Sequence, residues 1–280
     1  MTISNSDFVT SRGAAMFFIV AFIICLILHA ILMLWKRTWF MIWFVIGCIL
    51  EIVGYVQEHS GSSSQAASII IAPIFLAASV YVSFSHIINH YELRHLIPVP
   101  PSLLSLLLFC IDLLCLAAQV AGIVLQFMSG KQNVGRALVI ISFVFQIILF
   151  VFFVGTVIMV KRRVGRSPVN QVNSRFQLPS FFVLLIVISV LFFVRNVFRL
   201  IEYAQGFGYI FHHAIFTYIF DGVPILLAAL GLAVFHPSLW MEMKRKTAKN
   251  KKGQSQEDES SVRRIDQSID HRPSVDGAVV

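Results

Sequence analysis

Seven long stretches of hydrophobic residues run along this chain, separated by short polar segments. Each stretch holds about 20 residues, which is the length that an α-helix needs to cross about 30 Å of hydrocarbon. The segments between them are rich in glycine, serine, proline and charged residues, as is typical of turns. The pattern predicts seven transmembrane helices, at about 14–35, 39–57, 68–91, 103–128, 136–160, 179–203 and 211–238.

The composition agrees with a chain whose main solvent is lipid. Of its 280 residues, 58% are hydrophobic and only 13% are charged, whereas about a quarter of a soluble domain is charged. We therefore expect an all-α membrane protein, a seven-transmembrane helix bundle over 14–240. Residues 241–280 have few apolar side chains and no aromatic ones, so they are expected to form a disordered basic cytosolic tail. Residues 1–13 are expected to be an extracellular N-terminus.

The positions of Lys and Arg predict the orientation in the membrane. These residues gather after the first, third and fifth stretches and in the tail, and few lie in the alternate segments. Because basic residues flank spans on the cytosolic side, the N-terminus is predicted to lie outside and the C-terminus inside. The net charge of +8 arises from these short clusters, so it favours contact between the tail and anionic inner-leaflet lipids over nucleic-acid binding.

Several charged and polar residues interrupt the predicted spans. A charge at the centre of a bilayer costs at least about 2.5 kcal/mol, so such a residue is expected to have a partner or to face a water-filled cavity. Arg195, Arg199 and Glu202 are spaced to share one helix face. We predict a substrate-binding cavity, open outward, formed by Glu51, Tyr55, Tyr81, Asp112, Gln119, Arg195, Arg199, Glu202 and Asp221.

A structural role is the alternative for these residues. Glu51 or Asp112 would then pair with Arg195 or Arg199 and hold helices together, and Arg199 with Glu202 would form a pair within one helix.

The sequence shows no sign of catalytic chemistry. His213 and His236 lie too far apart on one predicted helix, about 34 Å, to share a metal ion, and neither H-E-x-x-H nor G-x-S-x-G occurs. We expect no enzyme activity, no metal and no cofactor. The chain also lacks the phosphate-binding G-x-x-x-x-G-K-[ST] motif, so any transport is expected to be passive, ion-coupled or driven by a partner.

The order of polar motifs along the spans resembles the fungal lipid-translocating exporter family, named for resistance to aminocholesterol. The resemblance covers roughly residues 14–240 and rests on six motifs in the expected order. They are Glu51, Gly54 and Tyr55; Ala72, Pro73 and Tyr81; Asp112, Gln119 and Gly122; Gly135 and Gln146; Arg195, Arg199, Glu202 and Gly206; and Tyr218, Asp221, His236 and Pro237.

Four positions depart from the family pattern. Glu58 and His86 stand where the family usually has arginine, Ala214 stands where it commonly has glutamate, and Ser142 replaces a glycine. The first three departures change the charge of the expected site.

The resemblance implies a transporter or translocase of amphiphilic molecules, such as sphingoid long-chain bases, sterol-like toxins or porphyrin, in the plasma membrane. The partners implied are membrane lipids and amphiphilic small molecules. A seven-helix sensor that regulates lipid homeostasis is the alternative, since it would have the same topology.

Overall fold

The computed structural model describes residues 12–60, 65–166, 177–205, 213–234 and 236. Within these residues every regular element is helical. Seven helices are long and apolar enough to cross a membrane, which confirms the predicted all-α membrane fold. The predicted disordered tail and extracellular N-terminus fall almost wholly outside the described residues, and the orientation stays a prediction.

The helices follow the predicted order closely. The first six spans are α1 (Arg12–Lys36), η1 with α2 (Trp39–Met41 and Ile42–His59), α3 (Gln65–His90), α4 (Pro101–Gln126), α5 (Gln132–Arg166) and α6 (Gln177–Gln205). A short helix η2 (Leu93–Leu96) follows α3. The seventh span is built from three consecutive pieces, α7 (Ala214–Thr217), η4 (Tyr218–Gly222) and α8 (Val223–Val234).

Two of the predicted bounds differ from the structure for physical reasons. Helix α5 extends beyond the predicted 136–160 at both ends. At its C-terminal end the added residues include Lys161, Arg162 and Arg163, which are good helix formers and whose charged ends can reach water. A charge therefore marks the end of the hydrocarbon and not the end of the helix. Helix α8 ends at Val234, four residues before the predicted 238, as the residue preceding Pro237 is disfavoured in a helix.

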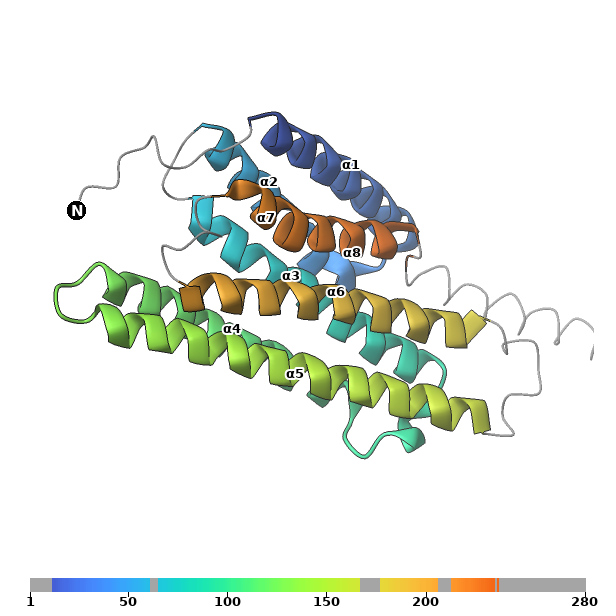
Figure 1. Cartoon of the computed structure of the whole chain (residues 1–280). Coiled ribbons are helices and arrows are strands. Elements are labelled where there is room, and N and C mark those ends of the chain that lie inside the picture. Colours follow the sequence, from blue (N-terminus) through green and yellow to red (C-terminus); the bar gives the residue numbers. More distant parts are fainter. Residues whose placement is uncertain (1–11, 61–64, 167–176, 206–212, 235, 237–280) are drawn as a thin grey trace, which may run out of the picture. The chain divides into compact units, whose positions relative to one another are not determined.

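Helix α3 occupies the middle of the bundle. Figure 1 shows α1, α2 and α8 on one side and α4 and α5 on the other, with α3 and α6 between them. Each helix packs mainly against its neighbours in sequence, and α8 packs against both α6 and α1. In the most apolar 18-residue stretch of the span 68–90, 78% is buried, compared with 28% in the corresponding stretch of α1. Polar side chains that face α3 are thus shielded from lipid.

Glycines bring two pairs of helices close together. A Cβ atom added to Gly54 on α2 would lie 2.7 Å from the Ile69 side chain on α3. A Cβ atom added to Gly122 on α4 would lie 2.7 Å from the carbonyl oxygen of Gly135 on α5. Both distances are shorter than a carbon contact allows, so these crossings require residues without a side chain.

One buried histidine pair lies at the end of α8. His236 follows the helix, is fully buried and has its ring centroid 5.5 Å from that of His29 on α1. Burial lowers the pKa of His236 to about 4, since desolvation disfavours the charged ring. The ring is therefore neutral at pH 7 and belongs to the packed interior.

Candidate functional site

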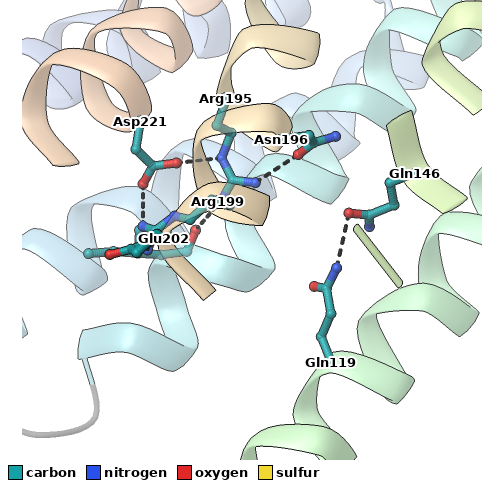
Figure 2. Close-up of polar contacts among 8 residues, drawn as sticks. Gln119, Gln146, Arg195, Asn196, Arg199, Glu202 and Asp221 are labelled. Carbon is teal, nitrogen blue, oxygen red and sulfur yellow. Dashed lines mark hydrogen bonds and ion pairs between the residues drawn. The ribbon is translucent and has the colours of Figure 1, made fainter. Parts of the chain in front are cut away.

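The two arginines of α6 converge on one carboxylate of the seventh span. Arg195 Nε lies 2.6 Å from Asp221 Oδ1, and Arg199 Nη2 lies 2.5 Å from Asp221 Oδ2. Arg199 Nη1 also reaches Glu202 Oε2 at 2.9 Å, within the same helix. Figure 2 shows Asp221 facing both guanidinium groups. The predicted partners Glu51 and Asp112 are therefore wrong for these arginines, whereas the predicted pair of Arg199 with Glu202 is confirmed.

A widened helical turn presents Asp221 to α6. Residues Tyr218–Gly222 form a π-helical turn, closed by a hydrogen bond from the Val223 N–H to the Tyr218 carbonyl. Pro224 follows at once. Since its ring has no N–H and would crowd the carbonyl four residues earlier in an α-helix, a wider turn relieves that clash. Such turns frequently occur at functional sites.

Arg195 also compensates a break in α3. Pro73 lies inside this helix and has no N–H, so it cannot bond the carbonyl of Ile69 four residues earlier. Arg195 Nη2 donates to that carbonyl at 3.2 Å, while its Nη1 donates to Asn196 Oδ1 at 3.2 Å. One guanidinium therefore links α6, the π-helical turn and the proline break of α3.

Glu51 lies beside this network without joining it. Its side chain is 1% exposed, and its Oε1 has no hydrogen-bond partner among the described residues. Electrostatic interactions reach it from Asp221, Arg195 and Arg199. Since an unpaired buried carboxylate is costly, Glu51 is an acidic group beside the network that still needs a donor for Oε1.

An aromatic stack lies next to Glu51. The Phe18 ring is nearly parallel to the Tyr55 ring at 4.9 Å and to the Tyr218 ring at 5.7 Å. Gly222 makes this packing possible, because a Cβ atom there would lie 2.6 Å from the Tyr55 hydroxyl. The stack brings the predicted site residue Tyr55 together with helices α1 and η4.

The positions that depart from the family pattern differ in whether they lie in the polar network. Glu58 is buried and accepts a hydrogen bond from the Tyr218 hydroxyl, so it joins the network. His86 is exposed and stacks on Phe40 at 4.1 Å, which places it outside the network. Ser142 is buried and donates to the carbonyl of Leu138. Ala214 begins α7, and its side chain lies outside the described residues.

The remaining predicted residues form a second polar group between α3, α4 and α5. The Tyr81 hydroxyl donates to Asp112 Oδ2 at 2.9 Å, and Gln119 Nε2 donates to Gln146 Oε1 at 3.0 Å. A pocket joins this group to the arginine network, lined by Pro73, Asp112, Gln119, Gln146, Arg195 and Asn196 among others. It has room for about one water molecule.

Sequence reasoning missed three polar members of these groups as site residues: Glu58, Gln146 and Asn196. Gln146 and Glu58 were noticed only as matching or departing from a motif, and Asn196 gave no signal. For the contact of Arg195 with α3 the sequence did hold a signal. A proline inside a buried helix, here Pro73, leaves a carbonyl that needs another donor.

The arrangement is suited to binding polar groups within the membrane. It combines buried carboxylates and arginines from four spans with aromatic rings and amide side chains. Among the described residues no cluster of His, Cys, Asp and Glu could hold a metal ion.

Comparison with known proteins identifies the family. The sequence profile of the family described as RTA1 like protein matches residues 44–244, which is most of the chain and runs from α2 beyond α8. The chain belongs to this RTA1-like family. The resemblance seen in the spacing of the polar motifs is thereby confirmed.

Three curated relatives come from Saccharomyces cerevisiae. The chain is 28% identical to protoporphyrin uptake protein 1 over 67% of its own length and 65% of that protein. It is 30% identical to protein RTM1, covering 67% of this chain and 64% of that protein, and 26% identical to protein RTA1, covering 68% and 63%. The chain thus spans slightly less than two thirds of each relative. No solved structure matches it.

Proposed function

We propose that this member of the RTA1-like family is a non-enzymatic translocase of amphiphilic molecules, located in the plasma membrane. Sphingoid long-chain bases, sterol-like toxins and porphyrin are the candidate substrates. The tail of the ligand would stay among the apolar side chains that face lipid. Its polar head would cross the hydrocarbon beside the buried charged groups, which lowers the cost of that passage.

The observation that carries the proposal is the buried, unpartnered Glu51 beside the network of Arg195, Arg199 and Asp221. In a network that serves structure alone, a buried carboxylate oxygen normally accepts a hydrogen bond. A ligand head with an amine or hydroxyl would supply that donor. One relative is named protoporphyrin uptake protein 1, and the uptake of a porphyrin by that protein supports the proposal for this chain.

The described conformation is closed around this site. The pocket between the two polar groups has room for about one water molecule, which is far less than the head of an amphiphile requires. Translocation therefore requires a second conformation in which α6 and the π-helical turn move relative to α3. The proline break of α3 and the π-helical turn of the seventh span are where such movement is cheapest, since regular helical bonding is already interrupted there.

Release of a labelled sphingoid base from cells with and without the protein tests the proposal. Glu51→Gln keeps the shape of the side chain and removes no hydrogen bond to Oε1, so the variant is expected to fold. It should slow release by roughly tenfold, the effect of losing about 1.4 kcal/mol of binding. Glu92→Gln removes a charge outside the spans and is expected to match the unaltered chain.

Release measurements in the same cells also distinguish between the candidate substrates and between a translocase and a sensor. If the long-chain base is released equally with and without the protein, labelled porphyrin is the second substrate to measure. If neither moves faster when the protein is present at the membrane, the translocase proposal is wrong. The seven-helix sensor would then be the better account of the buried network.

A further inference from the structure

Asp112 is a buried carboxyl group that no cation among the described residues neutralises. It lies near the middle of α4 and is 2% exposed. Its Oδ2 accepts the Tyr81 hydroxyl at 2.9 Å, and its Oδ1 has no hydrogen-bond partner among the described residues. A single hydroxyl donor compensates little of the cost of burying a full charge in hydrocarbon.

In the part of the chain that the structure describes, the groups next to Asp112 on α3, α4 and α5 are not cations. Helix α3 contributes Tyr81, α5 contributes the neutral Gln146, and Asp112's own helix contributes Cys115 and Gln119. The one charged group that lines the same pocket is Arg195 on α6.

Each nitrogen of the Arg195 guanidinium already has a partner. Its Nε faces Asp221, its Nη1 donates to Asn196 and its Nη2 donates to the Ile69 carbonyl. Neutralising Asp112 through Arg195 would remove one of the two arginine contacts that link α6 to the seventh span. A proton on Oδ1 is the change that removes the buried charge without disturbing these contacts.

The pocket provides the space through which such a proton could arrive. Asp112 lines it together with the side chains of Gln119, Gln146 and Asn196. The pocket also has apolar walls, including Ile74 and Phe150, and it has room for about one water molecule. Its carboxyl, amide and guanidinium groups are the kind of partners that hold a buried water. Water and amide oxygens can accept a hydrogen bond from a protonated Oδ1.

We propose that Asp112 binds and releases a proton at Oδ1 through this pocket, and that this proton is coupled to the translocation cycle. In the binding step the carboxylate and one proton from water form a neutral carboxyl group. In the release step the O–H bond breaks and the proton returns to water on the opposite side of the membrane. The coupling rests on the proposed function, whereas the proton site itself does not.

Infrared difference spectroscopy of the full chain in lipid tests the proton site. The carbonyl stretch of a protonated carboxyl group should be present at low pH and disappear as the pH rises, and Asp112→Asn should remove this band. Glu51→Gln is the matched control and should keep it. Tyr81→Phe removes the donor to Oδ2, so it should shift the band, which identifies Asp112 even if Asp112→Asn does not fold. A titrating band that both Asp112→Asn and Tyr81→Phe leave unchanged, or the lack of any titrating band, overturns the proton site.

Flux of a labelled long-chain base into vesicles, with and without an imposed pH gradient, tests the coupling. A gradient of one pH unit supports at most about tenfold accumulation for each coupled proton. The unaltered chain should respond to the gradient, and the ratio of its fluxes with and without the gradient should fall to one in Asp112→Asn. Flux that ignores the gradient overturns the coupling while the infrared result stands. If neither the long-chain base nor labelled porphyrin shows any flux, both the coupling and the proposed function are overturned, and the infrared result still decides the proton site.

Discussion

Asp221 is the residue on which the buried charges depend. Its two oxygens face Arg195 and Arg199, and all three side chains are at most 10% exposed. Replacing it by Asn would leave two guanidinium groups in the interior without their shared counter-ion. Removing one partner of a buried ion pair costs about 3–5 kcal/mol. We therefore expect Asp221→Asn to lower the melting temperature of the detergent-solubilised protein strongly.

Glu202→Gln is the matched control for that substitution. Among the described residues Glu202 pairs only with Arg199, three residues earlier on the same helix. The glutamine side chain keeps an oxygen that can accept from Arg199, and Arg199 keeps Asp221 as its counter-ion. The melting temperature should therefore fall much less than in Asp221→Asn. Equal melting temperatures for the two variants would show that Asp221 does not hold the arginines.

Arg195 on α6 is expected to stabilise α3 at its proline break. In Pro73→Ala the new N–H can bond the carbonyl of Ile69, which in the native chain accepts from Arg195 Nη2. Removing Arg195, as Arg195→Met, should then cost about 1–2 kcal/mol less than it does in the native chain, because no carbonyl is left without a donor.

A double-mutant cycle on the free energy of unfolding measures this coupling. Pro101→Ala is the control background, since Pro101 begins α4 and belongs to neither the break in α3 nor the π-helical turn that presents Asp221. If the cost of Arg195→Met is the same in the Pro73→Ala background as in the native chain, Arg195 does not compensate the break.

The packing of α4 against α5 predicts opposite effects for two glycines of one helix. A Cβ atom at Gly135 would meet the Gly122 carbonyl and lie 2.9 Å from the Gln126 amide nitrogen, whereas one at Gly155 would meet nothing within 4 Å. Gly135→Ala should destabilise the protein by about 1–3 kcal/mol, as overpacking does. Gly155→Ala should stabilise it by about 0.5–1 kcal/mol, because glycine is unfavourable within a helix.

Thermal unfolding of both variants in the same detergent gives the comparison. Gly135→Ala is also expected to disturb the hydrogen bond between Gln119 and Gln146, which joins the same two helices. The close crossing of α4 and α5 would be refuted by two alanine variants that both stabilise the protein.

The elements of this protein could be predicted from its sequence, but most of the side-chain partners could not. Apolar runs of the right length fix seven spans because only a helix satisfies its own backbone in lipid. The shared face of Arg195 and Arg199 also follows from helical spacing. Their pairing with Asp221 depends on how α6 meets a π-helical turn, and a regular 3.6-residue period gives no sign of that turn. Glu58 was noticed as a departure from a motif, while its bond to Tyr218 requires the fold.

At the scale of the whole molecule, the distribution of Lys and Arg predicts which ends of the helices face the cytosol. The segment after α3 contains Arg94. Arg163, near the C-terminal end of α5, donates a hydrogen bond to the Leu96 carbonyl of the same segment at 2.6 Å, so these basic residues lie at one end of the bundle. The segment between α4 and α5 contains Lys131 as its one basic residue. By the positive-inside rule the first segment is cytosolic and the second is outside.

Labelling of single cysteines with a membrane-impermeant thiol reagent tests this orientation. The native Cys25, Cys48, Cys110 and Cys115 all lie within spans, so they can be replaced before one cysteine is introduced into an exposed loop. Since thiol reagents attack the thiolate in water, Ser129→Cys should react in intact cells, and His95→Cys should react only after the membrane is opened. The reverse order would place the N-terminus in the cytosol, and the charged network would then lie nearer the cytosolic face. Because each segment is labelled in a separate variant, equal reactivity of both in intact cells would also reveal a chain inserted in two orientations.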